Sequence, residues 1–276
     1  MPAWTLQAAI DPLTIFFVLT TMLSVGLDLT FDEIFASLKQ RRLLSRALLA
    51  NLVLVPLLAA GLVRAVPMET GYVVGILLIA IAPGAPFGPK FAEISKSDIA
   101  FASGLMAVLG ILSVVTIPIS VTALMPGDVA VDPIAIARMI LLAQLVPLVV
   151  GLVIQARYRP FATRLSAPLQ RLSTYSLVLL IGLLVATNFD GLVGLAGTGS
   201  IAISTLVVGG SLLVGYGFGG PARPTREVLA TTTAARNAAV ALLIATTFSS
   251  QRVLTVIVAF SLVSVGMAGL VAGKWR

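Results

Sequence analysis

The sequence predicts an all-α polytopic membrane protein with about nine transmembrane helices. Of its 276 residues, 58% are hydrophobic and only 11% are charged, whereas soluble proteins carry roughly 25% charged residues. The mean hydropathy is +1.08. Apolar runs recur along nearly the whole chain, and each has about the 20 residues that a helix needs to cross the hydrocarbon core.

The apolar runs divide the chain into spans joined by short loops, so we expect one transmembrane domain over residues 1–276. The N-terminal segment lacks the basic start of a cleavable signal peptide, and its apolar run is long enough to be the first span. The expected spans lie at residues 8–29, 43–66, 70–95, 97–125, 133–156, 172–189, 195–219, 226–248 and 251–273.

The distribution of basic residues predicts the orientation. With nine spans, thirteen of the 18 Lys and Arg residues fall on one side, and only Arg64, Arg138 and Arg252 fall on the other. Cytoplasmic loops are enriched in Lys and Arg, so we expect a cell (inner) membrane protein with its N-terminus outside and its C-terminus in the cytoplasm. The net charge of +7 then reflects topology, and no nucleic-acid partner is expected.

The segment FDEIFASLKQRR after the first span is amphipathic. Helical spacing places Phe31, Ile34, Phe35 and Leu38 on one face, opposite charged residues. This pattern favours a helix lying in the inner membrane interface, with a simple polar connector as the alternative.

The span at residues 70–95 contains the sequence IAPGAPFGPKFAEISK. Each proline lacks a backbone donor and clashes with the preceding turn. A continuous helix is therefore excluded by Pro83, Pro86 and Pro89, which are interspersed with Gly84 and Gly88. Unpaired backbone at membrane depth is tolerated only where it is buried in protein or lines a watery cavity. We therefore expect a broken helix that is buried in protein or lines a cavity.

The span at residues 226–248 places Thr232, Thr233, Arg236 and Asn237 in the middle of an apolar helix. A guanidinium there costs about 2.5–3.5 kcal/mol on insertion scales, which marks it as a functional candidate. The two irregular spans are five helices apart and cross the membrane in opposite directions. That is the pattern of an inverted-repeat secondary transporter, in which broken helices meet near the midplane and offer half-helix N-termini to an anion.

Four motifs together resemble the bile acid:sodium symporter family: MLSVGLDLTFDEI, NLVLVPLLAAGL, APGAPFGPKFAEISKSDIAFASG and TTTAARNAAVAL. The resemblance covers nearly the whole chain in a nine-span form. It implies a panel of residues 8–29 and 133–189, and a core of residues 43–125 and 195–273. In the core the third and eighth spans would be broken and crossed.

The sequence departs from the pattern of the members that use sodium. Oxygen ligands of sodium that the resemblance implies have been replaced, at Gly88, Pro89, Ala102 and Met106. The family's glutamate and glutamine in the eighth span are Thr232 and Arg236, and the glutamine before the proline of the second span is Asn51. The asparagine that the family places in the substrate cavity is kept as Asn237.

Hard cations prefer oxygen ligands and a compensating negative charge, and this sequence has lost most of both. Our hypothesis is that Arg236 replaces a sodium ion, with its guanidinium held by Asn51, Thr232, Thr233 and backbone carbonyls. Two alternatives stay open. Arg236 contacts a substrate carboxylate, or it forms a structural ion pair with Glu93.

For each of the other polar residues, two interpretations are open. Either Lys90 faces the cavity, or it extends toward the cytoplasmic interface. Glu93 and Asp98 carry a coupling proton if they are buried, while Asp98 otherwise caps a helix. Asn237 lines the substrate cavity or bonds between helices. Pro83 and Gly84 belong to the broken turn of the ion and substrate pathway.

These observations predict a secondary transporter of a small organic anion, a carboxylate, that works by alternating access. An ordinary sodium-coupled symporter is the alternative, and a passive anion channel is a remote one. We expect no enzyme, because the chain has no histidine and no cysteine and no two aspartates fall within the core of one span. The expected partners are the anion and the lipid bilayer; no cofactor is expected, and sodium dependence is doubted.

Overall fold

The computed structural model describes residues 9–127, 129, 131–187, 189–248 and 250–276. All regular structure in these residues is helical, as the sequence predicted, and the first residue of the expected first span lies outside them. Eight stretches are long and apolar enough to cross a membrane: Ile10–Asp28 (α2), Arg41–Ala65 (α4, η1 and α5), Ile99–Leu124 (α8), Pro133–Arg157 (α9, η2 and α10), Arg159–Thr187 (α11), Ser200–Phe218 (α13), Arg223–Phe248 (α14, α15 and η4) and Gln251–Trp275 (α16).

The expected span at residues 70–95 is built from two short helices. They are α6 (Thr70–Ala80) and α7 (Gly88–Ile94), with residues 81–87 between them. At 1.5 Å per residue they measure roughly 16 and 10 Å, so neither alone covers a hydrocarbon core about 30 Å thick. The helix at residues 223–248 is also interrupted, between α14 (Arg223–Ala234) and α15 (Ala238–Ala245).

Helix α11 begins well before the expected start of the sixth span at residue 172. It starts at Arg159, so the expected loop over residues 157–171 is wrong. Charged side chains led us to place a loop there. Arginine is a good helix former, and its long side chain can carry the charge to water from a helical backbone. The basic residues therefore lie on the first turns of the helix.

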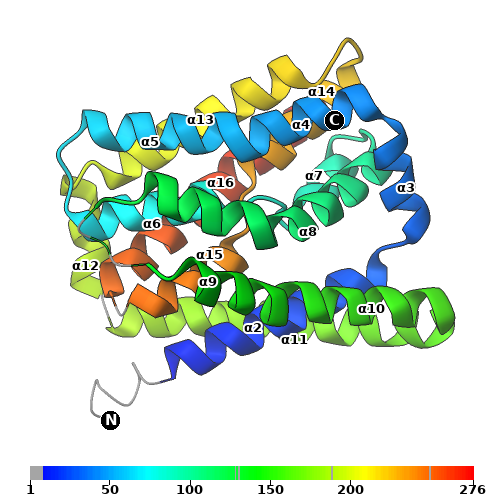
Figure 1. The fold of residues 1–276 in the computed structure, drawn as a ribbon, viewed down its shortest axis with the longest axis horizontal. Helices are drawn as coiled ribbons and strands as arrows, with labels where there is room; N and C mark the ends of the chain where they lie inside the picture. Colours follow the sequence, from blue (N-terminus) through cyan, green and yellow to red (C-terminus); the bar gives the residue numbers. More distant parts are fainter. Residues whose placement is uncertain (1–8, 128, 130, 188, 249) are drawn as a thin grey trace.

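Helix α2 packs against α10 (Val146–Arg157) and α11, and these three lie together along the lower side of Figure 1. Helix α13 packs against α5 (Val55–Ala65), α14 and α16 on the other side of the molecule. Glycine makes the α2–α10 contact possible. A Cβ on Gly26 would lie 2.2 Å from the carbonyl oxygen of Leu148, and one on Gly151 would lie 2.5 Å from that of Leu23.

The amphipathic segment after α2 is a helix, α3 (Phe31–Lys39), rather than a simple polar connector. A capping box starts it: Thr30 Oγ1 accepts from the Glu33 backbone N–H at 3.2 Å, and Glu33 Oε2 accepts from the Thr30 N–H at 2.8 Å. Its exposed apolar side chains are Phe31, Phe35 and Leu38. Ile34, expected on the same face, instead packs against the neighbouring helices.

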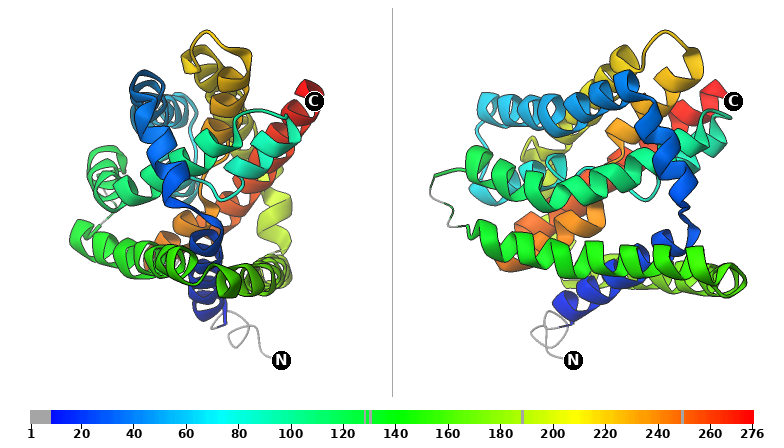
Figure 2. Two further views of the ribbon diagram at one scale, coloured as in Figure 1. Left: turned by 90° about the vertical axis from the view of Figure 1, so that its right-hand side faces the viewer. Right: turned by 45° about the vertical axis from the view of Figure 1, so that its right-hand side comes forward.

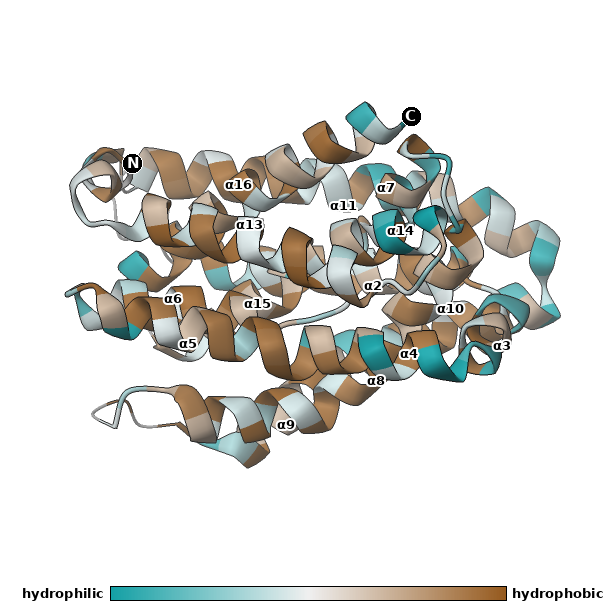
Figure 3. Cartoon of the chain, turned by 90° about the horizontal axis from the view of Figure 1, so that it is seen from above, coloured by the Kyte–Doolittle hydropathy of each residue, from teal (hydrophilic) through white to brown (hydrophobic). Residues whose placement is uncertain are grey.

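Helix α3 runs across one end of the bundle, between α2 and α4 (Arg41–Leu49), as Figures 1 and 2 show. Hydrophilic residues gather at this end, on α3, α4, α7 and α14 (Figure 3). The middle of the bundle is largely apolar in the same view. The molecule therefore has one distinctly polar end, which carries the beginnings of α4 and α14.

The close α2–α10 contact predicts that Gly151→Ala destabilises the protein. The added methyl group needs space that the α2 backbone occupies, and such overpacking costs about 1–3 kcal/mol. Gly61→Ala is the matched control, because it also adds a methyl group within a helix and a Cβ there meets nothing within 4 Å. We expect a lower unfolding midpoint for Gly151→Ala, and an unchanged or higher one for Gly61→Ala. Equal midpoints would contradict the packing argument.

Candidate cation and substrate site

The two interrupted helices contact each other at their interruptions. Asn237 makes two of the bonds across this contact: its backbone N–H donates to Ala82 O at 2.9 Å, and its Nδ2 donates to Gly84 O at 3.3 Å. Its Oδ1 accepts from the N–H of Val240 at 3.2 Å, which caps α15. The structure therefore gives Asn237 bonds between and within helices, and does not place it in the wall of the cavity described below.

The turn between α6 and α7 depends on Gly84, which has φ +78°. This conformation favours glycine. A side chain would also crowd α8, because a Cβ on Gly84 would lie 3.1 Å from Met106 O and 3.2 Å from Leu109 Cβ. Pro83 is buried beside it. These two residues shape the turn and hold it against α8.

Arg236 lies in the second interruption, between α14 and α15, and is only 4% exposed. Its Nη1 donates to Asn51 Oδ1 at 2.9 Å, and its Nη2 donates to the backbone oxygen of Asn51 at 3.0 Å. Nη2 also donates to the backbone oxygen of Ala80. The guanidinium thus joins three parts of the chain that are far apart in sequence.

The backbone oxygen of Asn51 is available because of a π-helical turn, η1 (Ala50–Leu54). The N–H of Val55 bonds to Ala50 O instead of Asn51 O. In a π-turn the next donor in line for Asn51 O is residue 56, which is Pro56 and has no N–H. Because the helix cannot use this oxygen, the guanidinium of Arg236 does.

Ala80 is the last residue of α6, and Arg236 itself follows the end of α14 by two residues. The last carbonyls of a helix have no partner within the helix, and they carry the negative end of its dipole. The C-terminus of α6 therefore lies beside the guanidinium, and that of α14 lies next to the backbone of Arg236. In secondary transporters with broken helices, such C-terminal ends and unwound carbonyls hold the coupling cation.

The two threonines before Arg236 have different surroundings. Thr233 Oγ1 accepts from Asn51 Nδ2 at 3.1 Å, so it orients the amide that binds the guanidinium. Thr232 Oγ1 donates to Val228 O at 2.7 Å, within its own helix. Arg236 is not among the described partners of either hydroxyl. Thr233 thus acts on the guanidinium only through Asn51.

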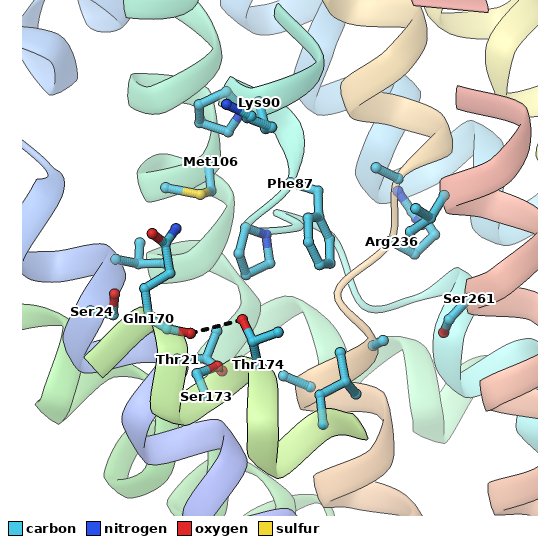
Figure 4. Close-up of a pocket in the computed structure, with 18 of the residues that line it drawn as sticks. Thr21, Ser24, Phe87, Lys90, Met106, Gln170, Ser173, Thr174, Arg236 and Ser261 are labelled. Atoms are coloured by element: carbon cyan, nitrogen blue, oxygen red, sulfur yellow. Dashed lines mark hydrogen bonds between the residues drawn. The ribbon is translucent and has the colours of Figure 1, made fainter. Parts of the chain in front are cut away.

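A cavity of about 730 Å³ lies between α2 and α11 on one side and the two interruptions on the other. Figure 4 shows Thr21, Ser24 and Ser173 on one side of this cavity and Arg236 on the other. The hydroxyls of Thr21 and Ser173 are 2.5 Å apart and join α2 to α11. Much of the remaining wall is apolar. The cavity therefore suits a ligand with an apolar body and a few polar groups.

Lys90 and Glu93 line the cavity and form an ion pair, with Nζ 2.6 Å from Oε2. Their side chains are 64% and 58% exposed, so the alternative that pairs Glu93 with Arg236 is wrong. Asp98 caps α8 by accepting from the N–H of Phe101 at 2.9 Å, which confirms that expectation. Among the described residues no carboxylate pairs with Arg236, and its Nε has no partner.

The positions at which we expected lost sodium ligands contain no side-chain oxygen. Gly88 and Pro89 begin α7, and a Cβ on Gly88 would lie 3.0 Å from the methyl carbon of Thr232. Ala102 is fully buried in α8, and Met106 lines the cavity.

The wall formed by α2 and α11 was missed by the sequence analysis. On α2, Thr21, Ser24 and Asp28 have the spacing of one helix face, and this polar stripe in an apolar span was a usable signal. On α11, Gln170 lies in the stretch that we had assigned to a loop.

A model of the Sodium Bile acid symporter family matches residues 14–195, which is more than half of the chain. The chain belongs to this family. Its sequence is 29% identical over 197 residues to the "Probable sodium/metabolite cotransporter BASS3, chloroplastic" of Arabidopsis thaliana, covering 71% of this chain and 46% of that protein. It is 22% identical over 171 residues to the "Uncharacterized sodium-dependent transporter YocS" of Bacillus subtilis, covering 62% and 53%.

The chain spans about half the length of the curated relatives it matches. Family membership and the membrane-spanning helices together make this a multi-pass membrane protein. The resemblance drawn from the four sequence motifs is confirmed at the level of the family.

The bonds between Arg236 and Asn51 predict strong coupling in a double-mutant cycle. We expect Asn51→Ala and Arg236→Gln each to lower the unfolding midpoint, because each leaves buried polar groups without partners. The double variant should lose less unfolding free energy than the two single variants lose in sum, with a coupling energy of about 1–3 kcal/mol. Arg236→Gln combined with Gly61→Ala is the control and should be additive. Additive losses for Asn51 and Arg236 would contradict the described bonds.

Proposed function

We propose that this protein is a secondary transporter that moves a small organic anion by alternating access, with Arg236 in place of a coupling sodium ion. The observation that carries the proposal is the guanidinium bonded to the carbonyl oxygen of Asn51 in the π-turn and to that of Ala80 at the C-terminus of α6. Those are the groups that hold the coupling cation in transporters with broken helices. The positive charge here is part of the chain.

The proposed architecture has nine spans, with α6 and α7 forming the third. Helices α2, α10 and α11, which pack together, would form the panel. The remaining spans would form the core, in which the two interrupted spans cross. The cavity lies between these two groups of helices, so a movement of the panel relative to the core would change which side of the membrane it faces.

The charges of the cavity favour an anion. Lys90 and Glu93 neutralise each other at its edge, while Arg236 has no carboxylate partner among the described residues. Ala238 and Ala239, at the start of α15, also line the cavity. The start of a helix carries a partial positive charge. A carboxylate held near Arg236 would meet both positive groups.

The polar end of the molecule, with the beginnings of α4 and α14, would face the cytoplasm by the positive-inside rule. The cavity includes residues from the end of α2 and the beginning of α8, both at this end of the bundle. The structure would then represent an inward-facing state in a cell membrane, with the C-terminus in the cytoplasm.

Ordinary sodium-coupled symport is the second candidate, because two relatives are named as sodium/metabolite or sodium-dependent transporters. Such a mechanism needs oxygen ligands for sodium besides those that Arg236 occupies. In a passive anion channel the flux would not saturate with anion concentration. Uptake into proteoliposomes at increasing anion concentrations measures this directly.

The test is the unfolding midpoint of the purified protein with small carboxylates, in sodium and with choline in its place. A ligand that binds only the folded state stabilises it by about 2.7 kcal/mol at a hundred times its Kd. We expect a carboxylate to raise the midpoint equally in sodium and in choline. If sodium alone raises the midpoint, or if the carboxylate requires it, Arg236 does not replace the ion.

The variant Arg236→Gln sharpens the test, since it removes the fixed charge and frees the carbonyls of Asn51 and Ala80. We expect the carboxylate to lose its effect in choline and to recover part of it in sodium. Arg252→Gln is the matched control, because Arg252 is 59% exposed and pairs with Glu69 outside the cavity. It should behave like the wild type in both salts. A carboxylate response in Arg236→Gln that needs no sodium would contradict the proposal.

A further inference from the structure

One face of α2 forms a wall of the cavity along much of the helix. Phe17, Thr21, Ser24 and Asp28 all line the cavity, and their spacing of three or four residues keeps them on the same face. The stripe starts with an aromatic ring, continues with two hydroxyls and ends with a carboxylate. Asp28 is the last residue of the helix.

The carboxylate of Asp28, on α2, is held in place by a side chain of α11, the other helix of this wall. Ser166, on α11, donates from its Oγ to Asp28 Oδ1. Ser166 is 8% exposed, so its hydroxyl is a buried anchor. Asp28 itself remains exposed at the end of the cavity, with one charged group fixed in a defined position.

The cavity has a simple charge balance among its described lining residues. Its ionisable side chains are Asp28, Lys90, Glu93 and Arg236. Lys90 and Glu93 form an ion pair, which leaves Arg236 as the unpaired positive charge and Asp28 as the unpaired negative charge. One cation can balance one anionic group of a ligand, and no second free cation for another lies among the described residues that line the cavity.

We propose that Asp28 restricts the cavity to anions with a single negative charge. This inference rests on the proposed function, in which an organic anion binds with its carboxylate near Arg236. A second carboxylate on the same ligand would have no cation left to balance it, and it would be repelled by Asp28. A neutral or hydrogen-bond-donating group at that end would meet no such repulsion.

The physical basis is that specificity often comes from a repulsive element directed against the wrong ligand. Like charges brought together in a binding site are strongly unfavourable, and a cleft of low dielectric constant strengthens the field compared with bulk water. Asp28 is exposed, so water screens part of the repulsion. We therefore expect a preference of about tenfold between ligands with one and two charges.

The experiment uses ligands matched in length that differ in charge. Adipate and glutarate carry two charges, and their monomethyl esters carry one. The purified protein in phosphatidylcholine nanodiscs is titrated with each ligand, and the shift in its unfolding midpoint gives the apparent Kd. For the wild type, we expect each monomethyl ester to bind about tenfold more tightly than its parent dicarboxylate.

In the variant Asp28→Asn, the apparent Kd values of each monomethyl ester and its parent dicarboxylate should differ by no more than about threefold, mainly because the dicarboxylate binds more tightly. This substitution removes the charge and keeps an oxygen that can accept from Ser166. Asp28→Glu retains the charge and should retain the preference. Asp32→Asn is the matched control, because it removes a carboxylate on the next helix, α3, and that carboxylate does not line the cavity. It should leave the preference unchanged.

Three outcomes would overturn the inference while leaving the proposed function intact: equal binding of both charge classes by the wild type, an unchanged preference in Asp28→Asn, or the same loss of preference in Asp32→Asn. If neither charge class binds the wild type, the proposed function fails, and this inference fails with it. The two failures are therefore distinguishable.

Discussion

The bonds of Arg236 to Asn51 and to the last carbonyl of α6 are the interaction on which the centre of this structure depends. A charge taken out of water costs several kcal/mol unless other groups replace its hydration. Here Asn51 supplies an amide oxygen and a backbone oxygen, and Ala80 supplies the end of α6. The dependence is mutual, because without the guanidinium these oxygens would be buried with no donor.

Fixing the cation in the chain has a consequence for energy coupling. In a sodium symporter the ion binds and leaves in every cycle, so its gradient can drive the substrate. A guanidinium tethered to the backbone cannot leave. If Arg236 replaces sodium, transport must follow the gradient of the anion itself, or of another ion that moves with it. The same bonds would keep the two interruptions together in the inward-facing and outward-facing states.

The cavity combines this fixed charge with a second, independent wall. Helices α2 and α11 contribute hydroxyls and a carboxylate, and they are joined to each other through Thr21 and Ser173. In the proposed architecture, the wall belongs to the panel and the interruptions belong to the core. Their relative position therefore determines both the size of the cavity and the distance between its two unpaired charges, Arg236 and Asp28.

The sequence by itself determined most of the helical spans, the interruption at the prolines and the unusual arginine, because apolar length, proline and a charge in an apolar run act locally. The interruption beside Arg236 contains no proline and was implied only by the family resemblance. The sequence also indicated Asn51 and backbone carbonyls as partners of Arg236. Only the tertiary structure decided which carbonyls bind the guanidinium. The π-turn before Pro56 leaves the backbone oxygen of Asn51 free, and its donor, Arg236, is 185 positions away in the sequence. The tertiary structure also separated Glu93 from Arg236 and brought Asp28 into the cavity. Those placements depend on how distant helices pack, which no local pattern encodes.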